Sequence, residues 1–244
     1  MITLYDCSTA PSPRRARILL AEKGIRHETV QVDLRNGEQL GEAYRKINPQ
    51  CTVPALRTQE GVILADNAAI TAWAEARHPD PPLLGTTPLE KAEVASWNWR
   101  AEFEGLLAIA EAMRNTSPAL ANRALAGPAN YAQIPELGKR GIERLQRFLV
   151  VLNERLEGRD YVAGDRFSVA DLTAASLLGP IVAPSELQYQ PPASVRESIA
   201  RVRESFAGHP ALEWTAEMFR RHRGTSAEEP ALRSLRSPPL QKEG

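Results

Sequence analysis

The chain has 244 residues, of which 43% are hydrophobic and 25% charged, enough for one large or two modest domains with a sizeable core. Its 30 basic residues balance its 30 acidic residues, so the surface has no net charge to attract nucleic acid or an anionic membrane. Two cysteines, Cys7 and Cys51, are too few for a disulfide framework, and the four histidines are too scattered for a metal site.

The N-terminal sequence lacks the basic start and the apolar run of a signal peptide. No stretch approaches the roughly 18 consecutive apolar residues of a membrane helix. We therefore expect a cytoplasmic protein that binds neither membranes nor nucleic acid.

Strand and helix patterns alternate over the first 78 residues. Pro11 and Pro13 suit the entrance of a helix, because proline fixes φ and its missing N–H is not needed there, and Gly24 suits the end of that helix. The patterns predict strands at residues 2–5, 30–34, 53–58 and 62–64, and helices at residues 14–23, 38–47 and 66–78. This order, β-α-β-α-β-β-α, is that of a thioredoxin-like α/β domain.

The remainder of the chain is helical in pattern. Ser168 and Asp171 form a capping box at the start of one of its helices. The patterns predict helices at residues 89–115, 131–157, 167 onward, 195–206 and 211–222. We therefore predict an α/β domain at residues 1–78, a proline-rich linker at 79–88, an all-helical domain at 89–223 and a flexible tail at 224–244.

A proline follows Val53 at the start of a predicted strand. Proline donates no hydrogen bond to a sheet, so its position there needs a reason. A cis peptide bond between Val53 and Pro54 would turn the N–H and C=O of Val53 outward, where they can hold an extended peptide as an added strand. The alternative is an ordinary strand entrance.

Asp66 and Asn67 stand at the predicted start of a helix. Either side chain can cap the helix, and the free N–H groups of the first turn then suit a carboxylate. The Asp66 carboxylate suits an ammonium group, so the pair fits a zwitterionic amino-acid end such as a γ-glutamyl group. The alternative is a plain helix cap.

Taken in order, these motifs resemble those of the soluble glutathione S-transferases, particularly bacterial members. The shared features are the Leu4-Tyr5 strand, Arg15-Ala16-Arg17 with Glu22-Lys23-Gly24-Ile25, Asn48-Pro49 with Val53-Pro54, the Asp66-Asn67 helix start and Phe167-Ser168-Val169-Ala170-Asp171. They extend over roughly residues 1–222. The resemblance implies a thioredoxin-like glutathione-binding domain followed by the family's all-helical domain, in a cytoplasmic, homodimeric detoxification enzyme.

The resemblance also implies residue roles. In the family, the residue before the proline holds the cysteinyl backbone of glutathione, and an acidic-polar pair holds its γ-glutamyl end. Val53, Pro54, Asp66 and Asn67 are therefore the expected glutathione-binding residues, and Gln39 is a further candidate for the glycyl carboxylate. The family usually has Glu-Ser in place of Asp66-Asn67, so the reach of the acidic side chain differs by about one methylene.

The residue that usually contacts the glutathione sulfur is replaced in this chain. Many members have Ser or Cys five residues before the arginine of the first helix, and here that position is Ala10. Ser12 is the first candidate to replace it, because some bacterial members place a polar residue two positions further on. Thr9 is the second candidate. Cys7 is either a redox nucleophile or, more simply, a buried thiol.

Arg14, Arg15 and Arg17 crowd the first turn of that helix, where cations oppose the helix dipole. We expect two of them on a solvated face and one close enough to stabilise an anionic thiolate. We expect Glu102 and Glu104, on the later helix at residues 89–115, on a solvated face too.

Trp99, Phe103 and Met113 are the candidates for the second-substrate pocket, because the family uses this helix both for that pocket and for the dimer interface. Trp97 and Trp99 are two residues apart and cannot share one helix face, so a core or interface role is the alternative for at least one of them.

The expected function is that of a glutathione S-transferase-like enzyme. It would stabilise the glutathione thiolate, without a metal, for attack on a small hydrophobic electrophile or for reduction of a peroxide or disulfide. One alternative is a non-catalytic binding or regulatory module with this fold, for which Ala10 argues. The other is a glutathione-dependent isomerase or dehalogenase.

Overall fold

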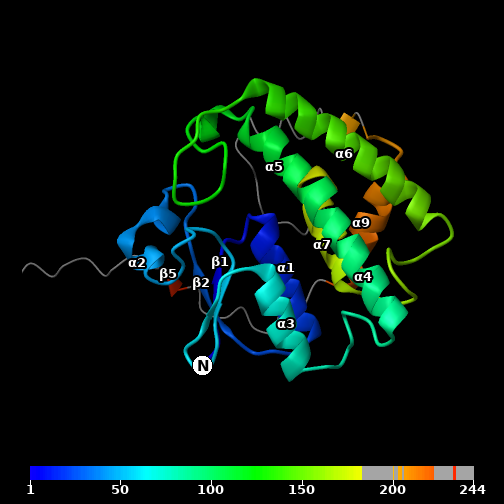
Figure 1. Cartoon of the computed structure of the whole chain (residues 1–244), viewed down its shortest axis with the longest axis horizontal. Coiled ribbons are helices and arrows are strands. Elements are labelled where there is room, and N and C mark those ends of the chain that lie inside the picture. Colours follow the sequence, from blue (N-terminus) through cyan, green and yellow to red (C-terminus); the bar gives the residue numbers. More distant parts are fainter. Residues whose placement is uncertain (183–199, 201–202, 205, 223–232, 235–244) are drawn as a thin grey trace, which may run out of the picture.

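The computed structural model describes residues 1–182, 200, 203–204, 206–222 and 233–234, which form two packed parts (Figure 1). The first part has the predicted order of elements. These are β1 (Thr3–Asp6), α1 (Pro11–Glu22), β2 (Glu28–Gln31), the 3-10 helix η1 (Glu38–Leu40), α2 (Glu42–Arg45), β3 (Ala55–Arg57), β4 (Ile63–Leu64) and α3 (Asn67–Arg77). The thioredoxin-like fold of this part is confirmed.

The strands form one mixed sheet in the order β4-β3-β1-β2-β5. Strand β1 runs parallel to β2 and antiparallel to β3, so that Tyr5 lies between Val30 and Ala55. Helices α1 and α3 lie on the side of the sheet that faces the helical part, and α2 lies on the other side (Figure 1). Strand β5 (Arg233–Ser234), parallel to β2, belongs to the predicted tail, whose other residues lie outside the described ones.

The predicted single helix at residues 38–47 is wrong. The backbone of Gly41 is extended, with φ −70° and ψ 155°, and separates η1 from α2. Glycine is about 1 kcal/mol less favourable than alanine inside a helix, which favours a break at this position.

The second part is all-helical, as predicted. It contains α4 (Pro88–Arg100), the π-helical stretch η2 (Ala101–Leu106), α5 (Leu107–Arg114), the 3-10 helix η3 (Pro118–Leu120), α6 (Pro135–Leu156), α7 (Val169–Val182) and α9 (Pro210–Arg221). The predicted helix at residues 195–206 lies mostly outside the described residues.

Helices α4, η2 and α5 continue one another as a single rod, where one regular helix was predicted (Figure 1). Gly105 in η2 allows the rod to approach its neighbours closely. A Cβ added at Gly105 would lie 2.7 Å from Leu177 of α7 and 3.0 Å from Phe148 of α6. Almost every residue of α7 is buried, and α7 also packs against α1, so it joins the two parts.

Helix α6 begins at Pro135, four residues later than predicted, because proline takes the first position of a helix far better than an interior one. The preceding residues form a loop held by its own side chains. Arg123 donates to the carbonyl of Gly127 at 2.6 Å, and Gln133 donates to the carbonyls of Arg114 and Ser117 at 2.7 Å each.

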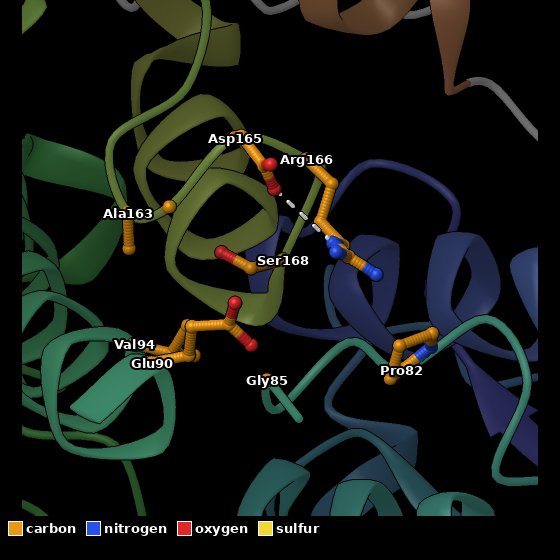
Figure 2. Close-up of a pocket in the computed structure, with 9 residues that line it drawn as sticks. Pro82, Gly85, Glu90, Val94, Ala163, Asp165, Arg166 and Ser168 are labelled. Atoms are coloured by element: carbon orange, nitrogen blue, oxygen red, sulfur yellow. Dashed lines mark hydrogen bonds and ion pairs between the residues drawn. The ribbon is translucent and has the colours of Figure 1, made fainter. Parts of the chain in front are cut away.

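The linker meets the helical part around the starts of α4 and α7. A cavity of only about 10 Å³ lies there, bordered by Pro82, Glu90 and Ser168 (Figure 2). That volume holds at most one water molecule, so this junction is a packed contact and no ligand site.

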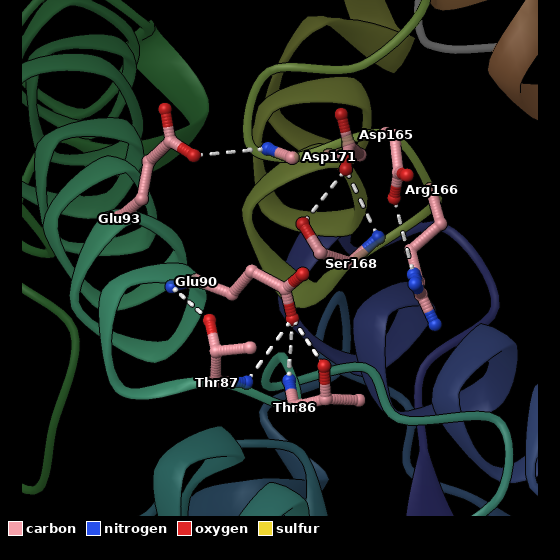
Figure 3. Close-up of polar contacts among 9 residues, drawn as sticks. Thr86, Thr87, Glu90, Glu93, Asp165, Arg166, Ser168 and Asp171 are labelled. Atoms are coloured by element: carbon pink, nitrogen blue, oxygen red, sulfur yellow. Dashed lines mark hydrogen bonds and ion pairs between the residues drawn. The ribbon is translucent and has the colours of Figure 1, made fainter.

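Two capping boxes flank this junction (Figure 3). At α4, Thr87 Oγ1 accepts a hydrogen bond from the N–H of Glu90, whose carboxylate accepts one in return from the N–H of Thr87. At α7, Asp171 accepts hydrogen bonds from both the N–H and the hydroxyl of Ser168, at 2.9 and 2.7 Å. The N–H of Val162 donates to the same carboxylate at 2.6 Å. Asp171 thus reaches back to Ser168 as predicted, but the Ser168 hydroxyl donates to Asp171 and does not accept from its N–H, so the predicted box at Ser168 is only half formed.

Candidate functional site

Helix α1 begins beside the sheet without a capping side chain. Ala10 is extended and contributes no side-chain hydrogen bond, Pro11 takes the first helical position, and the first turn contains no acidic residue. The positive end of this helix is therefore available to an anion.

The two predicted sulfur-contacting residues flank Ala10 and have different partners. Thr9 Oγ1 lies 3.3 Å from Sγ of the buried Cys7, in a hydrogen bond for which either atom can be the donor. Ser12 Oγ accepts a hydrogen bond from Nη2 of Arg15 at 3.4 Å. Because a guanidinium group only donates, the hydroxyl proton of Ser12 remains available to a ligand.

The Val53–Pro54 peptide bond is cis, as expected. Outside the helices and strands of the described chain, no backbone hydrogen bond uses the N–H or C=O of Val53. The peptide before it is fixed, because the carbonyl of Thr52 accepts hydrogen bonds from Tyr44 Oη at 2.7 Å and Asn48 Nδ2 at 2.8 Å. Burial raises the pKa of Tyr44 far above its usual range, so this hydroxyl keeps its proton.

Asp66 and Asn67, at the start of α3, make different contacts. Asp66 is the exposed N-cap, and its Oδ1 accepts a hydrogen bond from the N–H of Ala69 at 2.8 Å. Asn67 turns toward α1, where its Nδ2 donates to the carbonyl of Ser12 at 3.2 Å. Its Oδ1 is buried and has no hydrogen-bond partner in the described part of the chain. The structure thus brings Ser12 and Asn67 together.

A cavity of about 230 Å³ adjoins this contact, between α3, the α4–η2 rod and α7. Its polar lining consists of Arg15, Asn67, Thr71, Asn98, Glu102 and Thr173. Whole ligand sites usually measure roughly 300–1,000 Å³, so this cavity fits one end of a larger ligand. The lining includes Asn67 but not Val53, Pro54, Asp66 or Gln39.

Gln39 is buried in η1, and its Oε1 has no hydrogen-bond partner among the residues described. An unpartnered buried carboxamide needs an explanation, because leaving it unpaired costs about 1–3 kcal/mol. Because Oε1 only accepts, a bound group with a hydrogen-bond donor would supply the missing partner.

The expectation that two of the three arginines lie on a solvated face is wrong, because Arg14 and Arg15 are both buried. Arg14 lies over the ring of Phe219, 5.7 Å from its centroid, and burial lowers the pKa of Arg14 to about 10. Arg17 bonds the buried carboxylate of Asp6.

Arg15 forms an ion pair with Glu102, whose Oε1 lies 2.7 Å from Nη1. The side chain of Glu102 is 41% exposed, so it is solvated as expected, but it also reaches across to the first domain, which was not expected. Sequence reasoning missed this pair because the two residues are 87 positions apart. The hydrogen bonds from Tyr44 and Asn48 to the carbonyl before Val53 were missed as well, although Asn48 belongs to the quoted Asn48-Pro49 motif and Tyr44 lies four residues before it.

The candidates for the second-substrate pocket lie elsewhere on the rod. Trp99 and Phe103 are exposed and stack on each other, with ring centroids 4.9 Å apart, and Arg144 of α6 lies over Phe103. Met113 is exposed near the end of α5. None of the three lines the 230 Å³ cavity. Trp97, by contrast, is partly buried against the core.

Among the residues described, no group of three or more His, Cys, Asp and Glu side chains is arranged to hold a metal ion. The described helices include none with the length and apolar character to cross a membrane.

Comparison with known proteins identifies both parts of the chain. The model of the N-terminal domain of glutathione S-transferases matches residues 9–77, and that of the C-terminal domain matches residues 120–210. Glutathione S-transferase 2 of Saccharomyces cerevisiae is 35% identical over 173 residues, which are 70% of this chain and 72% of that protein.

A crystal structure of a glutathione S-transferase domain-containing protein from Marinobacter aquaeolei superposes with a TM-score of 0.66 at 32% identity, covering 86% of this chain and 99% of that chain. A maleylacetoacetate isomerase of Pseudomonas aeruginosa is 41% identical over a shorter stretch of 91 residues, 36% of this chain and 43% of that protein. The chain therefore belongs to the glutathione S-transferase family and is a glutathione transferase enzyme.

Proposed function

We propose that this enzyme holds glutathione across the starts of α1 and α3 and activates its thiol for attack on a small hydrophobic electrophile. The observation that carries this proposal is the hydrogen bond from Asn67 Nδ2 to the carbonyl of Ser12, which ties the two helix N-termini together. A helix N-terminus favours an anion. One end can thus serve a carboxylate and the other a thiolate of the same ligand.

Polar groups nearby would bind the remaining parts of glutathione. The free N–H and C=O of Val53, beside Pro54, would pair with the cysteinyl backbone as an added strand. The γ-glutamyl end would enter the 230 Å³ cavity beside Asn67, with its ammonium group near Asp66. Gln39 would bind the glycyl carboxylate through its Nε2 donor, and its buried Oε1 would accept from a donor group of the same ligand, such as the glycyl N–H.

The chemistry needs a thiolate at neutral pH. A free thiol has a pKa of about 8.5, and lowering it by two units takes about 2.7 kcal/mol. A hydrogen bond from the Ser12 hydroxyl and the positive end of α1 together supply much of that. The thiol proton passes to water, the sulfur forms a bond to the electrophilic carbon, and the leaving group departs with its electron pair. Reduction of a peroxide or mixed disulfide would begin from the same thiolate.

The sulfur-contacting residue is tested by single substitutions. Ser12→Ala should lower kcat with an aryl halide about 10-fold to 100-fold, because hydrogen bonds to charged groups contribute about 1.5–3 kcal/mol. Thr9→Ala and Cys7→Ala should have smaller effects, since these two side chains bond each other. Ser8→Ala, at an exposed neighbour, is the matched control. Full activity in Ser12→Ala, Thr9→Ala and Cys7→Ala alike would refute this site assignment.

Glutathione binding is tested separately from catalysis. Calorimetry should show a Kd for glutathione raised about 10-fold or more by Asp66→Ala and by Asn67→Ala, through lost charge-assisted hydrogen bonds. Asp165→Ala, which removes an exposed carboxylate at the far junction, should leave the Kd unchanged. A wild-type protein that is not retained on immobilised glutathione would contradict the proposal.

A glutathione-dependent isomerase is the second candidate function, favoured by the similarity to the maleylacetoacetate isomerase. An isomerase adds the thiolate to a carbon–carbon double bond and then releases it, so free thiol is regenerated. A transferase consumes it. Measuring free thiol during turnover of an unsaturated diketo acid and of an aryl halide distinguishes the two.

The remaining proposals concern the exposed side chains of the rod and the location and role of the enzyme in the cell. Trp99, Phe103 and Met113 would contact the electrophile or a second subunit of a homodimer. Phe103→Ala should raise the KM for the electrophile in the first case, and Phe103→Glu should yield a monomer by light scattering in the second.

A cytoplasmic, detoxifying role agrees with the free thiols of Cys7 and Cys51. Cell fractionation would test the location, and the sensitivity of cells without the enzyme to electrophiles would test the role.

A further inference from the structure

Arg15 links residues of both domains at the proposed sulfur site. Its side chain is buried, and the residue is only 6% exposed. Its Nη2 lies 3.4 Å from Ser12 Oγ in the same helix, and its Nη1 lies 2.7 Å from Glu102 Oε1 in η2 of the helical domain. Its Nε is buried without a hydrogen-bond partner in the described chain.

We propose that Arg15 is a positioning residue: held by Glu102, it fixes the hydroxyl group of Ser12 as the hydrogen-bond donor to the glutathione sulfur. This inference rests on the proposed function of Ser12.

The direction of the hydrogen bond between Arg15 and Ser12 is set by chemistry. A serine hydroxyl both donates and accepts, and its proton rotates toward whichever acceptor is near. A guanidinium group has donors only, so Ser12 Oγ must accept from Arg15 and its own proton must point elsewhere. An anionic sulfur is the acceptor that this arrangement favours.

The charge of Arg15 acts in the same direction. A cation bonded to Ser12 Oγ polarises the hydroxyl and strengthens its donation to an anion. The neighbouring cations have other partners, since Arg17 bonds Asp6 and Arg14 lies over Phe219.

Glu102 explains why Arg15 stays at this place. The ion pair with Glu102 offsets part of the cost of burying the Arg15 guanidinium group and holds it against the start of α1. Because Glu102 belongs to η2, the helical domain controls the geometry of a hydroxyl group in the first domain.

The test measures the pKa of the glutathione thiol bound to the full-length enzyme. The ultraviolet absorbance of the thiolate, recorded as a function of pH, gives this pKa. Arg15→Gln should raise this pKa by roughly 1 unit and lower kcat at pH 7 about tenfold. The KM for glutathione should change less than about threefold, since the backbone and γ-glutamyl contacts remain. Arg15→Lys keeps the charge but loses the fork geometry, and should give an intermediate value.

Two controls and one milder variant accompany this measurement. Arg26→Gln removes an exposed arginine, and Glu104→Gln removes the other acidic residue of η2 that pairs with an arginine; both should match the wild type. Glu102→Gln should shift the thiol pKa in the same direction as Arg15→Gln but less. It carries the test if Arg15→Gln does not fold.

A double-mutant cycle distinguishes positioning from a direct or merely structural effect. If Arg15 acts through Ser12, Arg15→Gln should change the thiol pKa by less than about 0.3 unit in the Ser12→Ala background, because coupled residues are non-additive. Additive shifts would overturn the inference, and so would an unchanged thiol pKa in Arg15→Gln while the wild type binds and transfers. A wild type that neither binds nor transfers would instead overturn the proposed function itself.

Discussion

The two boxes of the helical domain each place a carboxylate three residues after a Thr or Ser and bond it to the backbone N–H of that residue, but they differ in the role of the hydroxyl group and in burial. Thr87 and Glu90 lie at the exposed start of α4, whereas Ser168 and Asp171 are buried at the start of α7. The side-chain hydrogen bond from Thr86, with backbone hydrogen bonds, lowers the pKa of Glu90 to about 2. Burial raises the pKa of Asp171 to about 6, although that carboxylate accepts three hydrogen bonds. The pKa values of the two carboxylates are therefore shifted in opposite directions.

The difference shows what burial adds to a local motif. Water can replace the partner of any donor that the exposed box loses. The hydrogen bonds that converge on Asp171 are buried, so each lost partner leaves a buried polar group unpaired. The buried box should therefore dominate stability, and the following experiments measure by how much.

The largest effect is expected from Asp171→Ala. It leaves the N–H groups of Val162 and Ser168 buried without an acceptor, which costs about 1–3 kcal/mol each, so the free energy of unfolding should fall by about 3 kcal/mol or more. Urea unfolding at pH 7 measures this through the midpoint at constant m-value. A loss below about 1 kcal/mol would show that Asp171 is not the central acceptor.

The second-largest effect on stability is expected from titration of Asp171 in the buried box. The folded-state pKa of Asp171, about 6, lies above the unfolded value of 3.8, so the native state binds the extra proton between these values. The associated stability is fully present below pH 4 and is lost as the pH rises through 6, by about 3 kcal/mol in all. Unfolding midpoints from pH 4 to 7 should show this loss relative to Asp171→Asn, which cannot titrate; parallel curves for the two proteins would rule it out.

Thr87→Ala tests the exposed box and should have a smaller effect. Replacing an N-cap threonine by alanine costs about 1 kcal/mol, because one N–H of the first turn loses its acceptor but reaches water. Thermal unfolding compared with Thr87→Ser, which keeps the hydroxyl, isolates the cap. A loss as large as that of Asp171→Ala would remove the distinction between the boxes.

The smallest effect, with the opposite pH dependence, is expected from Glu90. Its folded-state pKa of about 2 lies below the unfolded value of 4.5, so its stabilisation is present above pH 4.5 and is lost as the pH falls through 2. Between pH 5 and pH 3, the wild type should lose slightly more stability than Glu90→Gln. A larger loss in Glu90→Gln would reverse the sign of this prediction.

Local chemistry made much of the fold and part of the site predictable. The cis bond before Pro54, the helix cap at Asp66-Asn67 and the contact between Ser168 and Asp171 each depend on residues a few positions apart, so the sequence indicates them, although it left an ordinary strand entrance open at Pro54 and either residue open as the cap at α3. The order of strands and helices in the first domain follows from equally local patterns.

Long-range packing accounts for what was missed. The ion pair between Arg15 and Glu102 joins residues 87 positions apart, and no local pattern distinguishes a buried arginine from a solvated one. The third donor to Asp171, the N–H of Val162, comes from a loop nine residues earlier. The sequence pattern does not reveal the π-helical stretch either. The need for glycine at position 105 comes from the close approach of Leu177 and Phe148, which belong to two other helices.

That stretch, η2, bears on how this protein can diverge by insertion and deletion. A π-helical turn accommodates one more residue than an α-helical turn while the axis keeps its direction. Deleting one residue from η2 would therefore convert the stretch to regular α-helix. The face of α4 that lines the cavity with Asn98 and the face of α5 beyond η2 would both keep their directions. A single-codon insertion or deletion in η2 can thus be absorbed as a change between π-helical and α-helical turns, without rotating one half of the rod against the other.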